Sequence, residues 1–470
     1  MDRFTSALDS QKAMRSGDIS ATELVEFALT NIAEIDHSGY ELRSVLALSP
    51  SARSEAEEVD RHKGNRPLEG LPILIKDNIE AVGLPATAGS LALAGDPIKQ
   101  DSELVARLKA AGAVVVGATN LSEWANIRSW KSTSGWSGVG GLTANPWIHK
   151  HSAGGSSSGS GAAVAAGLTT LAIGSETDGS IVCPASVNGC VGIKPTVGSV
   201  PRTGMIPISA SQDSPGPMGR SVADVALLLE VMTGNSGYLR AALQPEEIRI
   251  GVVREWLTAS DATNQIFEES ISLLRQSGVQ VHEVVIAAPE ESVSADEFAV
   301  LMYELHDDLA TYLSDRSGSK IKTLSDVVDF NTSHSDLEMQ YFQQEIFDKA
   351  LELGGRSGDY HKIRARNFAW ADQTLAVALA NVDVLVGAAY GPSWVSALGA
   401  GDDYASASWI SMAPAIAGTP IGALPMGLVS GLPVAIGVVT GRNQEKELVT
   451  AMALIERILG LGVLRPTFRK

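Results

Sequence analysis

The segment HSAGGSSSGSGAAVAAG, residues 151–167, gathers serines at positions 152, 156, 157, 158 and 160 between paired glycines and an alanine-rich run. Gly/Ser composition alone is typical of a flexible linker. Here, however, residues 162–166 continue directly as a predicted helix, and LTTLAIGSE (168–176) follows as a strand. The serine run is therefore predicted to lie at a helix N-terminus inside an α/β core.

Two functions are open to such a loop. Backbone N–H groups at a glycine-rich helix start bind anions, but the Gly-Lys-Ser/Thr ending of a nucleotide-binding loop is missing. Gly155-Ser156-Ser157-Ser158-Gly159 also fits the G-x-S-x-G nucleophile elbow, with Ser157 as nucleophile. That motif needs a preceding strand and a marked downstream histidine, whereas NPWIHKHSAG (145–154) resembles a loop and no later histidine lies in a marked setting.

Composition narrows the function further. The chain has 470 residues, 44% of them hydrophobic and 19% charged, and a net charge of −18, which disfavours nucleic acid as a partner because phosphates would be repelled. Its two cysteines, Cys183 and Cys190, exclude a disulfide scaffold and a four-cysteine metal site. Neither a secretory signal nor an apolar run of membrane-spanning length is recognised, so we expect a cytoplasmic protein with no membrane partner.

Helix and strand patterns alternate along most of the chain. Residues 1–65 are predicted to be helical, with a capping box at Ser20 and Glu23, and GLPILIKDN is a short strand that ends at Lys76. Residues 102–120 are a helix that leads into a strand, and four later strands are EIRIGVV, VQVHEVVI, VDVLVGAA and VAIGVVT, the last before an amphipathic helix. Residues 290–370 are predicted to be a helical insertion over the active-site face.

This alternation predicts an α/β fold in one large domain, residues 1–470, with a mixed, mostly parallel β-sheet covered by helices on both faces.

Two further segments suggest catalysis when they are taken with the serine run. Lys76 ends an apolar strand, where burial would lower the pKa of its amine and allow it to act as a base. Taken alone, it could equally be a solvated or ion-paired lysine. GSETDGSIVCPASVNGCVGIKPTVG (174–198) bends at several glycines around Ser180, which would free N–H groups for an oxyanion or merely form a turn.

Together the segments resemble the amidase signature family of serine hydrolases. The matching pieces are GLPILIKDNI, AGGSSSGSGAAVAAG, GSETDGSIVCPASVNGCVGIKPTVG and SQDSPGPMGRSVADVALLL, supported by GATNLSEWAN, AGTPIGALPMG and GLPVAIGVV. The resemblance implies a triad of Lys76, Ser156 in a cis peptide after Gly155, and the nucleophile Ser180. It also implies an oxyanion and substrate-binding region formed by Thr177, Asp178, Gly179, Gly155 and Ser157, with no metal and no cofactor.

The implied chemistry is consistent with the residues. A serine hydroxyl needs an adjacent base, and a neutral Lys76 would take the proton of Ser156 while Ser156 takes that of Ser180. Ser180 would then attack the amide carbonyl and form an acyl-enzyme.

Three positions depart from the commonest family pattern: Ser158, Asp178 and Val182. We expect an intact oxyanion hole, with the Asp178 carboxylate pointing aside or hydrogen-bonded locally. The motifs are most similar to the bacterial peptide-amidase branch, which predicts hydrolysis of a primary amide, such as a peptide carboxamide or a small acyl amide, to acid and ammonia. The alternatives are a glutaminase of the A-type amidotransferase kind that supplies ammonia to a partner, and a scaffold that only binds.

The sequence also allows expectations for the tryptophans and cysteines near the motifs. Among Trp124, Trp130, Trp136 and Trp147, most should pack in the core and one or two should line an acyl pocket. Cys183 and Cys190 should be buried packing residues. A homodimer is left open.

Overall fold

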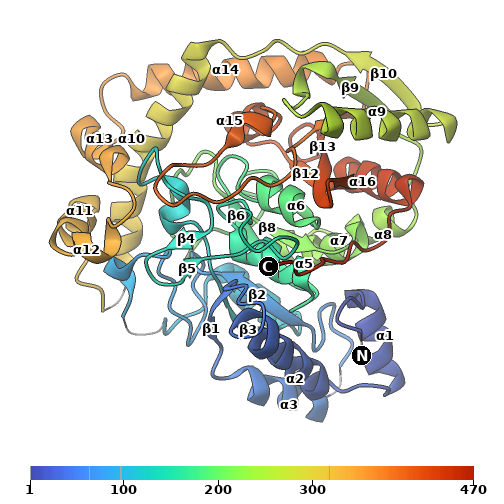
Figure 1. Cartoon of the computed structure of the whole chain (residues 1–470), viewed down its shortest axis with the longest axis horizontal. Coiled ribbons are helices and arrows are strands. Elements are labelled where there is room, and N and C mark those ends of the chain that lie inside the picture. The colour runs from blue at the N-terminus through green and yellow to red at the C-terminus, as the bar shows by residue number, and fades with distance from the viewer. Residues whose placement is uncertain (1, 63, 96–97, 317) are drawn as a thin grey trace.

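One continuous sheet of eleven strands organises the computed structural model, which describes residues 2–62, 64–95, 98–316 and 318–470 (Figure 1). In their order across the sheet, the strands are β1 (Val45–Leu48), β3 (Val114–Thr119), β2 (Pro72–Lys76), β6 (Leu171–Glu176), β8 (Ser214–Gly219), β7 (Val191–Lys194), β12 (Ile421–Val429), β13 (Leu432–Val439), β11 (Val384–Ala388), β9 (Arg249–Val253) and β10 (Gln280–Val284). A separate two-stranded ribbon pairs β4 (Trp136–Ser137) with β5 (Gly141–Leu142).

The sheet is mixed, and its parallel pairs lie in two groups. Strands β3, β2 and β6 are parallel to one another, as are β11, β9 and β10. The central strands between these groups, and the edge pair β1–β3, are antiparallel. Parallel pairing is therefore confined to the flanks, because β12 and β13 form a hairpin and β8 runs opposite to both of its neighbours.

Helices cover both faces of this sheet, as the sequence predicts for a single α/β domain. They are α1 (Ala7–Ser16), α2 (Ala21–Asn31), α3 (Ala52–Arg61), α4 (Glu103–Ala110), α5 (Ser158–Ala166), α6 (Val182–Asn188), α7 (Val222–Thr233), α8 (Tyr238–Leu243), α9 (Asp261–Gln276), α10 (Glu291–Asp315), α11 (Leu324–Ser333), α12 (Ser335–Glu338), α13 (Glu345–Leu353), α14 (Tyr360–Ala378), α15 (Met412–Ala417) and α16 (Glu445–Leu459). Helices α5, α6 and α15 pack in the core of one face, and α4, α7, α9 and α16 pack on the other.

Side-chain alternation along β2 decides where Lys76 points. Ile73 and Ile75 belong to the core that includes α4 and α7, whereas Leu74 belongs to the core that includes α5. Because successive side chains of a strand point to opposite faces, Lys76 points to the same face as Leu74. The lysine is thereby directed toward the N-terminus of α5, which follows the serine run.

The segment 290–370 contains α10 to α13 and the start of α14, drawn in yellow and orange at one side of the sheet in Figure 1. Its leucines Leu301, Leu305 and Leu309 pack against Trp124 and Ile127 of the main domain. At the other end of the chain, residues 1–65 hold α1 to α3 and also the short strand β1, which the sequence pattern did not predict. In the described ranges, no helix has the length and apolar character needed to cross a bilayer.

Candidate active site

Lys76 is fully buried at the end of β2, and its amine contacts neutral oxygens. Its Nζ lies 2.8 Å from Ser156 Oγ, 3.0 Å from Ser157 Oγ, and 3.0 and 3.1 Å from the hydroxyl and carbonyl oxygens of Ser175. Burial lowers the pKa of Lys76 to about 7, although the charges of Asp213 and Glu176 act in the opposite direction. The side chain is thus suited to exchange a proton near neutral pH.

The serine run is a buried turn that leads into α5. The peptide bond between Gly155 and Ser156 is cis, as the resemblance implies. A Cβ atom on Gly155 would overlap the hydroxyl of Ser122 and come within 2.6 Å of that of Ser134, so only glycine fits there. The N–H of Ser157 donates to the carbonyl oxygen of Ser180 at 3.0 Å, which ties this turn to the segment of the predicted nucleophile.

The position of Ser157 differs from the sequence-based prediction. It was expected in the oxyanion and substrate-binding region, but its side chain is fully buried and does not line the cavity. Its hydroxyl donates to the carbonyl oxygen of Ser175 at 3.0 Å and also contacts Lys76 Nζ. No strand lies between β5 and α5, so the geometry of a nucleophile elbow is also missing from this described segment.

Ser180 follows a tight turn at the end of β6. Glu176 Oε2 accepts hydrogen bonds from the N–H groups of Ile181 and Val182, at 2.6 and 2.9 Å, which closes the turn. Gly179, at φ +73°, occupies the left-handed region, and a Cβ there would lie 2.7 Å from the Tyr390 hydroxyl. Within the described ranges, the N–H of Ser180 donates to no protein acceptor, and it is therefore free to bind a developing oxyanion.

A cavity of about 580 Å³ opens in front of this turn. Gly155, Thr177, Asp178, Gly179 and Ser180 line it, whereas Lys76, Ser156 and Ser157 lie behind its wall. The remaining walls come from residues 125–132, from α10 and α13, and from residues 400–412. The sequence analysis expected the helices of 290–370 and one or two of the tryptophans here, whereas no motif marked residues 400–412.

Thr177 is held by a loop from a distant part of the chain. Its hydroxyl donates to Asp213 Oδ1 at 2.6 Å, and Asp213 Oδ2 accepts the N–H groups of Ile208 and Ser209 at 2.8 and 2.9 Å. Burial raises the pKa of Asp213 to about 6. Asp213 therefore fixes the loop 208–213 against the turn that carries Ser180.

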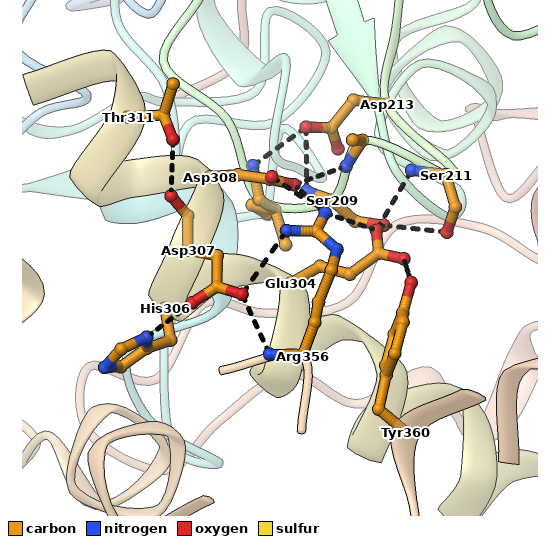
Figure 2. Close-up of polar contacts among 12 residues, drawn as sticks. Ser209, Ser211, Asp213, Glu304, His306, Asp307, Asp308, Thr311, Arg356 and Tyr360 are labelled. Atoms are coloured by element: carbon orange, nitrogen blue, oxygen red, sulfur yellow. Dashed lines mark hydrogen bonds and ion pairs between the residues drawn. The ribbon is translucent and has the colours of Figure 1, made fainter. Parts of the chain in front are cut away.

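Helix α10 holds the same loop from outside (Figure 2). Glu304 Oε2 accepts the Ser209 hydroxyl at 2.6 Å and the Ser211 N–H at 3.0 Å, while its Oε1 accepts the Tyr360 hydroxyl at 2.6 Å. Arg356 lies beside this carboxylate and pairs with Asp308 at 2.7 Å. The segment 290–370 is thus connected to the turn that carries Ser180 through an unbroken set of polar contacts.

The Asp178 carboxylate accepts a hydrogen bond from the Ser411 hydroxyl, which agrees with the local hydrogen bond expected from sequence. It lines the cavity, and its Oδ1 is buried without a hydrogen-bond partner. Burial raises the pKa of Asp178 to about 6, and contact with the Ser411 hydroxyl opposes this shift.

The tryptophans and the cysteines lie as expected from sequence. Trp124, Trp136 and Trp147 are buried, whereas Trp130 is 58% exposed and lines the cavity. Both cysteines are buried and free. Among the residues that the structure describes, no group of three or more His, Cys, Asp or Glu side chains is arranged to hold a metal ion.

Known proteins share this architecture. The amidase family model matches residues 23–449. The native peptide amidase of Stenotrophomonas maltophilia superimposes with a TM-score of 0.92 at 38% identity, covering 99% of both chains. A probable amidase of Arabidopsis thaliana is 34% identical over 74% of this chain and 72% of its own.

A second kind of relative is a component of the glutamyl-tRNA(Gln) amidotransferase of Lactobacillus acidophilus, which is 30% identical over 97% of both chains. The family model spans Lys76, Ser156 and Ser180, and the peptide amidase and the amidotransferase component match almost the whole chain. The chain therefore belongs to the amidase family of hydrolases, which act on amide C–N bonds.

Proposed function

We propose that this amidase hydrolyses a primary carboxamide to the acid and ammonia through an acyl-enzyme on Ser180. One observation carries the proposal: a buried lysine with a pKa of about 7 contacts Ser156 behind the cavity wall that exposes Ser180. A base in this state can remove a proton from a hydroxyl without the help of histidine.

The proposed first half-reaction is acylation. Ser180 Oγ attacks the carbonyl carbon while its proton passes to Ser156 Oγ, and the proton of Ser156 passes to Lys76 Nζ. The free N–H of Ser180 stabilises the resulting oxyanion, together with the backbone of the turn 177–179. Collapse of the tetrahedral intermediate breaks the C–N bond, and the proton returns along the same path to the leaving nitrogen, which departs as ammonia.

Deacylation repeats these steps with water. Water loses a proton through Ser156 to Lys76 as it attacks the acyl carbon, and the proton then returns to Ser180 Oγ as the ester bond breaks. Ser157 keeps the Lys76 amine in position through both halves, because its hydroxyl contacts Nζ at 3.0 Å.

The amidotransferase alternative is less well supported by the cavity. Glutamine carries an α-carboxylate, which requires a cationic partner when it is buried. Among the described residues that line the cavity, there is no lysine, arginine or histidine. The 38% identity to a peptide amidase over 99% of the chain also favours an amidase over an amidotransferase component.

We further propose that the protein works in the cytoplasm. Its two cysteines are buried as free thiols, as is usual in a reducing compartment. Fractionation of the source cells should recover the enzyme with the cytosolic proteins, and recovery with the secreted or membrane fraction would contradict this.

Ammonia release from a panel of amides tests the proposed reaction. Amidated dipeptides, an aliphatic amide, an aryl amide and glutamine would be offered to the wild type, to Ser180→Ala, and to Ser54→Ala, an exposed serine on α3. We expect turnover that disappears only in Ser180→Ala. Turnover that survives in Ser180→Ala, or glutamine as the sole substrate, would contradict the proposal.

A further inference from the structure

The charged side chains that line the substrate cavity in the described ranges are all acidic. Three carboxylates line it, Asp178, Glu297 and Asp402, and no basic side chain does so among the described residues. Asp402 is engaged, since it accepts hydrogen bonds from the Ser134 hydroxyl at 2.6 Å and from the Tyr404 hydroxyl at 2.9 Å. The other two carboxylates each have an oxygen with no protein partner in the described ranges.

Glu297 projects from α10 and is only 4% exposed. Its Oε1 accepts a hydrogen bond from Gln212 Nε2 at 2.9 Å, and its Oε2 accepts none from the described part of the chain. The buried Oδ1 of Asp178 is likewise unpartnered. Burial, reinforced by the neighbouring charge of Asp178, raises the pKa of Glu297 well above its usual range.

Such a pair is costly in the empty enzyme. Two buried like charges repel each other, so the empty pair favours a protonated Glu297, whereas a bound cation would favour its ionised form. The buried amine of Lys194 does not line the cavity and donates to the carbonyl oxygen of Thr419 at 2.5 Å, although its charge acts on Asp178 from behind the wall. Within the described cavity wall, therefore, no basic side chain is present to neutralise Asp178 and Glu297.

The apolar part of the cavity also suits a cation. Trp130 and Phe298, the residue after Glu297, both line it, with ring centroids 4.6 Å apart, and Trp409 lies on another wall. Aromatic faces attract ammonium and guanidinium groups.

We propose that the preferred substrate carries a cationic group on its acyl part, an ammonium or a guanidinium, which binds against Glu297 and Asp178. This inference rests on the proposed amidase function and names its substrate class. The cation is either the α-ammonium of an amino-acid amide or peptide amide, or a basic side chain. Amides that carry a carboxylate are excluded by repulsion.

Matched amides test the preference at neutral pH. Nα-acetyl-lysinamide supplies a cationic side chain, norleucinamide supplies an α-ammonium, Nα-acetyl-norleucinamide is neutral, and the α-amide of Nα-acetylglutamate is anionic. We expect kcat/KM of at least one cationic amide to exceed that of the neutral amide by about tenfold or more. The anionic amide should be the poorest. A neutral amide that equals or surpasses both cationic amides would overturn the proposal.

Glu297→Gln tests the assigned residue. Glutamine is nearly isosteric and keeps an oxygen for Gln212, so the fold should be retained. The ratio of kcat/KM for cationic over neutral amide should fall by about fivefold or more. Glu291→Gln, which removes the same charge from the exposed first turn of α10, should leave the ratio unchanged. An unchanged ratio in Glu297→Gln would show that this carboxylate does not bind the cationic group of the substrate.

Calorimetric binding to Ser180→Ala separates this inference from the proposed reaction. We expect tighter binding of Nα-acetyl-lysinamide or norleucinamide than of Nα-acetyl-norleucinamide. If the wild type cleaved no amide but this binding order held, the proposed function would fail and the charge preference would stand. If amides were cleaved and bound without regard to charge, the function would stand and the preference would fail.

Discussion

Lys76 combines full burial with hydrogen bonds to uncharged oxygens, and this combination makes its protonation state sensitive to pH near neutrality. A lysine in water keeps its proton until well above pH 9, where it cannot serve as a base. Desolvation brings the pKa of Lys76 to about 7, so a large fraction is neutral under ordinary conditions. In the proposed mechanism Lys76, acting through Ser156, takes the role that histidine has in more familiar serine hydrolases.

The first prediction concerns the acid limb of the pH profile. Only neutral Lys76 can accept a proton, so kcat/KM for the uncharged Nα-acetyl-norleucinamide should fall about tenfold per pH unit below about pH 7. Above that pH it should reach a plateau. Asp178→Asn should leave the pH at the midpoint of this acid limb unchanged, since Asp178 is not the base. A rate independent of pH between about pH 5 and 8 would contradict the role of the lysine.

The second prediction separates the two neighbouring serines of the turn. Ser157 positions Lys76 and does not line the cavity, so Ser157→Ala should lower kcat by about ten- to a hundredfold and change KM little. Ser156→Ala should cost at least about a thousandfold, because it removes the proton path itself. Steady-state kinetics would measure both. A Ser157→Ala defect confined to KM would show that this serine binds substrate.

At the scale of elements, α10 joins a distant part of the chain to the turn that carries Ser180. It reaches the cavity with Glu297 and holds the loop 208–213 with Glu304, and that loop holds Thr177 through Asp213. The insertion is therefore both a wall of the substrate cavity and a support for the residues next to Ser180.

The third prediction tests that support. Glu304→Gln weakens the acceptor for Ser209 and Ser211 and should lower the free energy of unfolding by about 1.5–3 kcal/mol, with a reduced kcat. Glu352→Gln, in an exposed pair with Lys349, should change stability by less than about 1 kcal/mol. Urea unfolding would measure both variants. Equal free energies of unfolding for the two variants would show that the contacts of Glu304 with Ser209 and Ser211 do not stabilise the protein.

Element prediction from sequence succeeded where the hydrophobic pattern was regular. The strand ending at Lys76, the helix and strand in 102–120, and the strands at β9, β10, β11 and β13 are confirmed. Strand β8 (SPGPMG) was missed because two prolines and two glycines resemble a turn. Its prolines lie two residues apart, so both lack an N–H on the same side of the strand. Strand β7 pairs only with Met218 and Gly219, beyond the prolines.

The site was predictable only in part, for a physical reason. Lys76, Ser156 and Ser180 lie in short glycine-rich motifs whose order along the chain is informative. Ser157 lies in the same motif, yet its orientation depends on how α5 packs on β6, which no local pattern encodes. Glu297 lies on an ordinary amphipathic helix and faces the cavity only because of tertiary packing.

At the scale of the whole molecule, the buried Arg128 joins the segment 290–370 to the rest of the domain. Arg128 donates to Glu123 Oε2 at 2.6 Å and to the carbonyl oxygen of Glu338 at 2.8 Å, and its guanidinium lies 4.2 Å from the centroid of Phe342. Burial raises the pKa of Glu123 well above its usual range, and its hydrogen bond with Glu338 adds to this.

The fourth prediction follows from this contact. Arg128→Met leaves buried carboxyl and carbonyl oxygens unpaired and should destabilise the protein by about 3–5 kcal/mol. The exposed pair of Arg53 with Glu26 provides the comparison, since Arg53→Met should cost less than about 1 kcal/mol. Scanning calorimetry should show a Tm several degrees lower for Arg128→Met alone. Similar Tm values for the two variants would contradict the structural importance of Arg128.

The central claim is that Ser180 is the nucleophile, and trapping the acyl-enzyme tests it most directly. An activated aryl ester of Nα-acetyl-norleucine would be mixed with the enzyme and quenched in acid, and the digested protein would be analysed by mass spectrometry. The account predicts the acyl group on the peptide that contains Ser180, and its loss in Ser180→Ala. An acyl group on Ser156 or Ser157, or full turnover with no adduct at any serine, would contradict it.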